Sequence, residues 1–207
     1  MIQEYSIPEW LVVSRETQSK LERLCSIVEK WNRAINLVSK PAIRNLWERH
    51  VLDSAQLLAY VPSETRLLVD LGSGGGFPGL VIGILSAELR PQATIILVES
   101  DKRKAVFLAE AARELGIAVK VKCQRVNSIP PINADVVSAR AFASLTELCG
   151  HASVHLAQGG LAIFPKGVGS KDEIDTAQKS WRFSLETKAS KTDSSASILL
   201  LKDIVHV

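Results

Sequence analysis

The sequence lacks the features of a membrane-spanning or secreted protein. Among its 207 residues, the longest apolar stretch near the centre, Gly79 to Leu85, is far shorter than the roughly 20 residues that cross a bilayer. The stretch from Met1 to Trp10 carries Glu4, Glu9 and Pro8 where a signal peptide would have a basic flank and an apolar run. We therefore predict a cytoplasmic protein with no membrane partner.

Cysteine is also scarce. The chain has 3 cysteines, Cys25, Cys123 and Cys149, which lack the spacing of metal ligands and have apolar neighbours. An odd number of such residues is typical of reduced thiols packed in the core of a cytosolic protein. The sequence predicts no metal site.

The net charge of +3 neither requires nor excludes a polyanionic partner. Its distribution is more informative, because residues 27–50 hold five Lys and Arg against two acidic residues, and residues 101–125 hold seven against three. Two basic clusters are a modest footprint for nucleic acid, since phosphate contacts supply most of the sequence-independent affinity. A solvated mixed surface would give the same pattern, so charge alone leaves both interpretations open.

The first 60 residues predict helices only. Ser14 or Thr17 can cap a helix that runs to about Ile35, with apolar residues every three or four positions. A second helix is expected from Ile43 to about Leu58. This region is short for an independent core, so we predict that residues 1–62 form a helical extension packed on the rest of the chain.

Residues 63–207 have the pattern of one α/β domain. Apolar runs suited to buried parallel strands lie at Leu67–Asp70, Ile95–Glu99, Val119–Cys123 and Ala134–Ser138. Helices are expected between them, at Gly79–Leu89 and at Lys102–Leu115 before Gly116. Two further strands are expected at Leu161–Phe164 and Ser197–Leu201, with a polar, weakly periodic stretch from Gly167 to Lys191 between them. The alternation predicts a doubly wound, mostly parallel sheet with a ligand crevice at the carboxyl ends of the strands.

A glycine-rich loop follows the first strand, from Asp70 to Gly79, and satisfies two motifs. Asp-x-Gly-x-Gly-x-Gly spans Asp70 to Gly76, and Gly-x-Gly-x-x-Gly spans Gly74 to Gly79. The second motif alone is weak and belongs to dinucleotide-binding sites, where a carboxylate such as Glu99 binds the ribose. The structural alternative is a tight strand-to-helix turn.

The acidic residue at the start of the loop, Asp70, distinguishes between the two kinds of ligand that these motifs predict. We expect Asp70 at the mouth of the loop, where it would repel a pyrophosphate and attract a cationic ligand. S-adenosylmethionine carries an ammonium, a sulfonium and no phosphate, so it fits better than a dinucleotide. We predict a class I, Rossmann-like S-adenosylmethionine-dependent methyltransferase, with a dehydrogenase as the alternative. The expected cofactor-binding residues of the motif are Asp70, Gly72, Gly74, Gly76 and Glu99.

At the end of the fourth strand the chain reads Ser138-Ala139-Arg140-Ala141-Phe142, not the Asn- or Asp-Pro-Pro-aromatic motif of many enzymes that methylate exocyclic amines. Burying Arg140 without an anionic or carbonyl partner is costly, so we expect it to contact a ligand. Phe142 suits stacking on a base and core packing equally. His50 and Asp53 invite an acid–base role, but we interpret them as packing between helix and domain.

Several separate motifs resemble one family when they are taken together: Trp31-Asn32 to Asn36-Leu37, Arg49-His50 to Asp53-Ser54, Asp70 to Gly79, Lys102-Arg103, Arg125-Val126 and Ser138 to Leu145. From about Trp31 to Lys166 the chain closely resembles the bacterial ribosomal RNA small subunit methyltransferase G family, formerly called glucose-inhibited division protein B. The resemblance implies a class I methyltransferase fold with an N-terminal helical extension. It also implies methyl transfer to N7 of a guanine in 16S ribosomal RNA.

The resemblance further implies individual roles. Cofactor contacts are implied for Gly72, Phe77, Glu99, Val126, Asn127 and Arg140. For the RNA, we expect contacts from Arg103, Arg125, Lys166 and Arg140. Two positions depart from the family. Asn127 stands where related sequences often have Glu, although an amide can still bond an adenine edge. An Arg expected before the last strand is replaced within Ser194-Ser195-Ala196-Ser197.

The implied reaction needs no general base, because guanine N7 has a lone pair and no proton. Catalysis then consists of positioning, for which Arg140 is the candidate, with a bond to guanine O6 as one means. Two rivals remain: a non-catalytic RNA-binding protein that retains the fold, and a small-molecule methyltransferase. Naked RNA, the small ribosomal subunit and an assembly intermediate are all open as the substrate, and so is the oligomeric state.

Overall fold

Helix α1 begins where the sequence provides a cap. In the computed structural model, which describes residues 5–207, the Ser14 hydroxyl accepts a hydrogen bond from the Thr17 N–H at 3.2 Å, and α1 runs over Arg15–Asn32. Ser14 is therefore the cap, and the helix ends three residues before the predicted Ile35. The prediction about a signal peptide concerns Met1 to Trp10, of which residues 1–4 lie outside the described residues.

The second predicted helix is wrong as a single element. The chain forms α2 at Lys40–Ile43, a π-helical turn at Trp47–Leu52, α3 at Asp53–Ala55 and a 3₁₀ turn at Gln56–Tyr60. Ser39 caps α2 and Pro41 lies in its first turn, so the helical conformation starts before Ile43. The changes of hydrogen-bonding pattern rotate successive side chains away from one common face. Uniform helical periodicity could not predict this arrangement.

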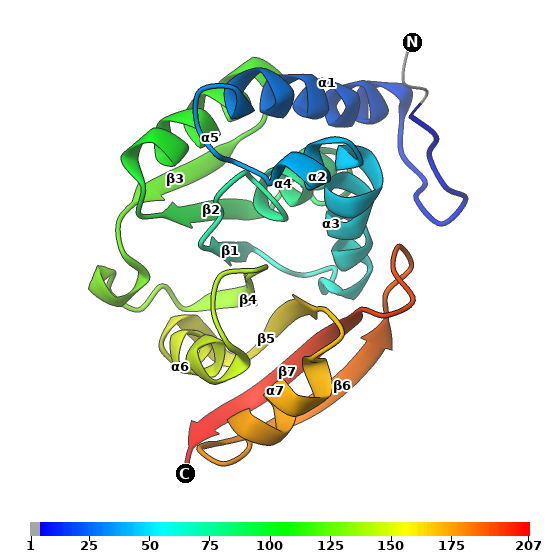
Figure 1. The fold of residues 1–207 in the computed structure, drawn as a ribbon. Coiled ribbons are helices and arrows are strands. Elements are labelled where there is room, and N and C mark those ends of the chain that lie inside the picture. The colour runs from blue at the N-terminus through cyan, green and yellow to red at the C-terminus, as the bar shows by residue number, and fades with distance from the viewer. Residues whose placement is uncertain (1–4) are drawn as a thin grey trace.

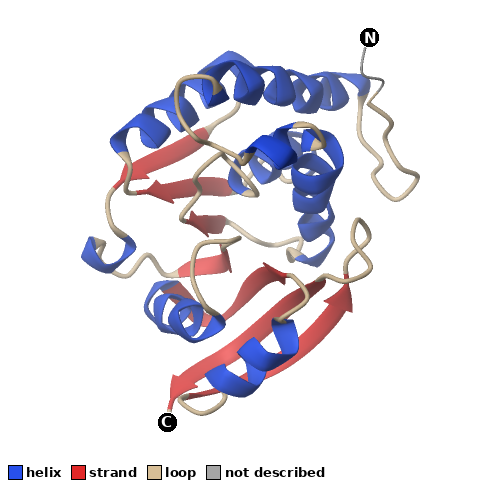
Figure 2. Ribbon diagram, viewed as in Figure 1, coloured by secondary structure: helices blue, strands red, loops and turns tan. Residues whose placement is uncertain are grey.

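Seven strands form one mixed sheet in the order β3-β2-β1-β4-β5-β7-β6 (Figures 1 and 2). Neighbours among β1 to β5 pair in parallel, whereas β7 is antiparallel to both β5 and β6. This confirms the mostly parallel, doubly wound sheet. The strands are β1 Leu67–Leu71, β2 Thr94–Glu99, β3 Val119–Cys123, β4 Ala134–Ser138, β5 Leu156–Lys166, β6 Trp181–Ala189 and β7 Ser197–His206.

Helices cover both faces of this sheet. Helices α4 (Gly79–Leu89) and α5 (Lys102–Leu115) pack with α1 on one face, and α6 (Leu145–His155) and α7 (Ser170–Ala177) lie on the other (Figure 1). Helix α4 is buried over most of its length, because α1 and α3 cover the side that faces away from the sheet. The helical extension thus shares one apolar core with the domain.

The polar stretch after β5 holds two elements that were not predicted individually, α7 and the edge strand β6. Side chains along β6 alternate between partly buried and exposed, so the strand lacks the apolar run that marks the central strands.

The exposure of Cys123 follows from the position of β3 at the opposite edge of the sheet. The residue is exposed at the end of β3, so the prediction of three packed thiols is wrong there, while Cys25 and Cys149 are buried. Burial raises the pKa of Cys25 to about 12.

Within residues 5–207, no helix combines the length and the apolar content needed to cross a bilayer.

The shared core predicts that the extension contributes to the stability of the whole chain. Leu24 of α1 is fully buried in the cluster that contains α4 and α5, so Leu24→Ala should lower the free energy of unfolding by about 2–5 kcal/mol. Urea unfolding followed by tryptophan fluorescence and by circular dichroism should show one common transition. Ser26→Ala, an exposed change in the same helix, is the control. Two separate transitions would show that the extension folds independently.

Candidate active site

The loops after β1, β2, β3 and β4 meet at the carboxyl edge of the sheet and line a cavity of about 620 Å³. The parallel register explains this meeting, because it aligns Asp70 of β1 with Leu97 of β2 and Ser138 of β4. Predicted site residues that line the cavity are Gly72, Gly74, Phe77, Glu99, Arg125, Val126, Asn127 and Arg140. Asp70, Gly76, Arg103 and Lys166 do not line it.

The glycine loop adopts a backbone that other residues rarely adopt. Gly72, Gly74 and Gly76 have φ values of 67°, 52° and 87°. Space is also restricted: a Cβ on Gly72 would lie 2.2 Å from the Phe142 ring, and one on Gly75 would lie 2.9 Å from the Leu37 carbonyl oxygen. The loop is therefore enclosed by Phe142 on one side and by the helical extension on the other. Gly76 packs against Leu80, away from the cavity.

Glu99 is held rigidly at the end of β2. Its Oε2 accepts a hydrogen bond from the Gly74 N–H at 2.8 Å, and its Oε1 accepts one from the Asp101 N–H at 2.7 Å. Each carboxylate oxygen can accept two bonds, so both retain an acceptor position on a side chain that lines the cavity. This arrangement suits two neighbouring hydroxyl groups of a ligand.

Asp70 lies beneath the loop, so its predicted place at the mouth is wrong. The residue is fully buried, and its Oδ1 accepts a hydrogen bond from the Ser138 hydroxyl at 2.8 Å. Its Oδ2 has no hydrogen-bond partner among residues 5–207, and a Cβ on Gly79 would lie only 2.6 Å from that atom. The carboxyl group therefore occupies the N-terminal end of α4, where a phosphate would otherwise bind. A pyrophosphate is disfavoured, but through this occupancy and not through repulsion at the mouth.

Arg140 finds its partners within the chain. One guanidinium nitrogen, Nη1, donates to Asp53 Oδ2 at 3.1 Å and to the Arg49 carbonyl oxygen at 2.9 Å, while Nη2 donates to His50 Nδ1. The guanidinium carbon lies 5.6 Å from the centre of the Phe77 ring. The anionic and carbonyl partners that we expected from a ligand are thus supplied by the helical extension. This also confirms that His50 and Asp53 join the extension to the domain.

The contact with Arg140 defines the state of His50. An arginine side chain can only donate, so Nδ1 accepts and the ring proton is on Nε2. Burial lowers the pKa of His50 to about 3, with further lowering from the charges of Arg140 and Arg49. The ring stacks on Phe77, with centroids 4.9 Å apart. A neutral imidazole with so low a pKa is a poor general base.

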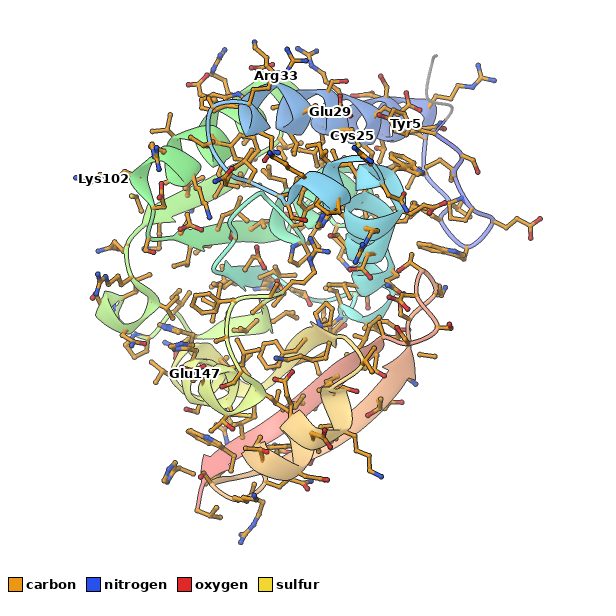
Figure 3. The ribbon with its side chains drawn as sticks, viewed as in Figure 1. Tyr5, Cys25, Glu29, Arg33, Lys102 and Glu147 are labelled. Atoms are coloured by element: carbon orange, nitrogen blue, oxygen red, sulfur yellow. The ribbon has the colours of Figure 1, made fainter. Side chains whose placement is uncertain are left out.

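The predicted RNA-binding residues differ in accessibility. Arg125 is exposed at the cavity, and Arg103 is exposed at the start of α5 beside Lys102, which projects from that helix (Figure 3). The ammonium of Lys166 instead pairs with Glu173 at 2.7 Å, and its side chain is only 10% exposed. The structure therefore gives Lys166 a partner inside the protein and corrects the expectation of a lysine open to RNA.

Sequence reasoning assigned no site role to several residues that line the cavity: Leu37, Val38, Lys104 and His151. Phe142 was an open case, and the structure packs its ring on Gly72 and beside His151 while leaving it 39% exposed. Leu37 and Val38 reach the cavity because Asn32 Oδ1 accepts hydrogen bonds from both of their N–H groups, at 2.8 and 3.0 Å. The Asn32 side chain was the signal in the sequence, as an amide that can shape a turn.

Comparison with known proteins shows similarity to one family over most of the chain. The model of the rRNA small subunit methyltransferase G family matches residues 17–198. The chain is 50% identical to the ribosomal RNA small subunit methyltransferase G of Cereibacter sphaeroides, over all of both chains. It is 48% identical to that of Ruegeria pomeroyi, over 95% of this chain and 96% of that one.

Solved structures support the fold. A SAM-dependent methyltransferase from Aquifex aeolicus matches with a TM-score of 0.59 and 11% identity, over 86% of this chain and 97% of that one. A ribosomal protein L11 methylase from Lactobacillus delbrueckii matches with a TM-score of 0.56 and 16% identity, over 74% and 77%. Together with the sheet described above, these matches establish the class I methyltransferase fold.

Burial of Asp70 predicts a characteristic pH dependence. Burial raises the pKa of this carboxyl from 3.8 to about 6, so between these values the folded protein binds the proton more tightly than the unfolded chain. The contribution of Asp70 therefore lowers stability as the pH rises through this range. Relative to the wild type, Asp70→Asn should gain on the order of 3 kcal/mol in unfolding free energy between about pH 4 and about pH 7.5.

Urea unfolding at a series of pH values measures this difference. The exposed α7 residue Asp175 provides a matched control, Asp175→Asn, whose stability should follow that of the wild type. Parallel curves for the wild type and Asp70→Asn would contradict the effect of burial.

Proposed function

Because the chain belongs to the ribosomal RNA small subunit methyltransferase G family, we propose that it transfers a methyl group from S-adenosylmethionine to N7 of a guanine in 16S ribosomal RNA. The observation that carries this proposal is the full-length identity of 50% with a relative of that name. Ribosomal RNA as the substrate is consistent with the cytoplasmic location expected from the sequence.

The cavity fits the cofactor. Its volume of about 620 Å³ is in the range of small-molecule sites, and Glu99 retains acceptor positions for the two ribose hydroxyls. Val98 and Val126 provide apolar surface for the adenine, and the Asn127 amide can bond its edge. Gly72 and Gly74 let the backbone approach the ligand, while Asp70 and Gly76 shape the loop from below. When bound, S-adenosylmethionine supplies an electrophilic methyl group.

The side chains around the cavity suit a reaction without proton abstraction. Guanine N7 offers a lone pair and carries no proton, so the enzyme's task is to hold the base in line at near-attack distance. His50 is neutral with a pKa of about 3, which fits the absence of a general base. Arg140 is the positioning group: of its five N–H groups three contact the helical extension, and the remaining two can serve an acceptor such as guanine O6.

A cationic margin surrounds the cavity and suits a polyanionic substrate. Lys104 and Arg125 line it, and Lys102 and Arg103 are exposed at the adjoining start of α5. Among the charged side chains lining the cavity, Glu99 is the acidic one, and it is held by two main-chain N–H groups. We assign this margin to the RNA backbone, whose phosphates would provide most of the binding energy.

Transfer of labelled methyl groups tests the function. Purified protein with labelled S-adenosylmethionine should label 16S RNA that lacks this modification, and nuclease digestion should release the label as 7-methylguanine nucleoside. The assay should compare naked RNA, small subunits and assembly intermediates as substrates. Cofactor binding without transfer to any of these would favour the non-catalytic RNA-binding alternative. Label in a small acceptor alone would favour a small-molecule methyltransferase.

The accessibility of the basic residues predicts which of them contribute to RNA binding. Arg103→Ala and Arg125→Ala should each weaken RNA binding and reduce the slope of log affinity against log salt concentration by about 1. Lys166→Ala should leave this slope unchanged, because its ammonium is paired with Glu173. Fluorescence anisotropy with a labelled 16S fragment measures the slope. Arg182→Ala, an exposed change on β6 outside the cavity, is the control. A reduced slope for Lys166→Ala would refute the assignment.

A further inference from the structure

The carboxylate of Asp53 is bound on both sides by residues from different parts of the chain. Its Oδ2 accepts from Arg140 at 3.1 Å, while its Oδ1 accepts from the Gln56 amide at 2.9 Å and from the Thr192 hydroxyl at 3.0 Å. The side chains of Asp53 and Arg140 are each only 16% exposed. The orientation of this carboxylate is therefore fixed by contacts that have nothing to do with a ligand.

Gln56 extends the same network to the turn between β6 and β7. It is buried, and its amide nitrogen also donates to Ser190 Oγ at 3.0 Å, while its carbonyl oxygen accepts from the Lys191 N–H at 2.7 Å. The Ser190 and Thr192 hydroxyls lie 3.1 Å apart within hydrogen-bonding distance. The turn Ser190–Ser195 is thus tied to the helical extension through Gln56 and to Arg140 through Asp53.

This network constrains the guanidinium group. Arg140 must hold one planar orientation to bond Asp53 and the Arg49 carbonyl through Nη1 and His50 through Nη2. The donors left over, one on Nη2 and the one on Nε, belong to a side chain that lines the cavity. Neither Asp53 nor Thr192 lines it, so both act on the cavity through Arg140.

We propose that Asp53 is the positioning residue for Arg140, and that Gln56 and Thr192 hold its carboxylate in the productive orientation. The expected change in kcat rests on the proposed function, whereas the positioning of Arg140 by Asp53 does not. It assigns a catalytic purpose to the link between the extension, the β6–β7 turn and the cavity. Loss of the Asp53 carboxylate leaves Arg140 with its contacts to the Arg49 carbonyl and His50, so its orientation is less restricted and the substrate is held less accurately.

Kinetics test the proposal with Asp53→Asn, which keeps the size of the side chain and removes its charge. We expect kcat to fall by about 10- to 100-fold, as misplacement of a positioning group does, with KM for RNA close to wild type. The urea midpoint should fall as well, because a guanidinium that is only 16% exposed loses its anionic partner, so kcat is measured without denaturant on protein shown to be folded by circular dichroism. Thr192→Val, which replaces the hydroxyl by a methyl group of similar size, should lower kcat in the same way but less. Asp193→Asn removes an exposed charge from the same turn without touching Asp53, and it should retain wild-type kinetics.

A double-mutant cycle shows whether Asp53 acts through Arg140. In an Arg140→Lys background, Asp53→Asn should lower kcat by less than threefold, because the positioned guanidinium is already absent. Independent effects that multiply would overturn the proposal. So would wild-type kcat in Asp53→Asn.

Nitrogen NMR of the arginine side chains gives a readout that does not depend on methylation. In the wild type the two Nη groups of Arg140 should give separate signals, because the contacts with Asp53 and His50 restrict rotation; Arg140→Lys assigns these signals by removing them. They should broaden in Asp53→Asn, where the contacts with the Arg49 carbonyl and His50 remain, and broaden less in Thr192→Val. If this holds while the wild type methylates no RNA, the proposed function fails and the positioning role stands. Unchanged Nη signals in Asp53→Asn would overturn the positioning role.

Discussion

The hydrogen bond from the Gly74 N–H to Glu99 joins the two loops on which the site is built. Gly74 follows β1 and Glu99 ends β2, so this bond of 2.8 Å fixes the distance between the ends of adjacent strands. A second bond, from the Ser73 N–H to the Val98 carbonyl oxygen at 3.0 Å, reinforces it. Both require the left-handed backbone that glycine permits at positions 72 and 74. The glycine pattern therefore specifies a backbone shape first, and ligand binding follows from that shape.

The helical extension completes a site that the domain alone would leave open. Its loop packs the Leu37 carbonyl against Gly75, and its π-helical turn supplies His50 and, through the Arg49 carbonyl, a partner for Arg140. Fully buried residues such as Leu24 join the extension to α4 and α5 in one core. Because the same segment provides both core and cavity wall, the geometry of the cavity depends on how the extension packs.

The predictable parts of this structure are those specified by local sequence. The strands β1 to β4, the glycine loop and the cap of α1 each depend on neighbouring residues, and the structure contains them where they were predicted. Strand β3 was expected to be buried, but it lies half-exposed at the edge of the sheet. Strand β6 was missed although its sequence carries a signal: Trp181, Phe183 and Leu185 alternate with polar residues, as expected for a half-buried edge strand. The sequence also did not show which residues pair with a buried charge, because such partners can lie far apart in the chain. Arg140 and Asp53, which pair in the structure, are 87 positions apart. Asp70 shows the same limit, since its position in the motif did not reveal that it lies under α4.

Pairing with Asp53 also matters for the charge that the proposed reaction creates. Methylation at N7 leaves a positive charge on the purine, and an unpaired guanidinium beside it would oppose that change at short range in a cavity partly shielded from water. A guanidinium that shares its charge with a carboxylate keeps its N–H donors while its field is largely cancelled. The two side chains together thus offer directional hydrogen bonds at low net charge. Lys104 and Arg125 carry no such requirement, because their place at the margin suits phosphates and not the reacting base.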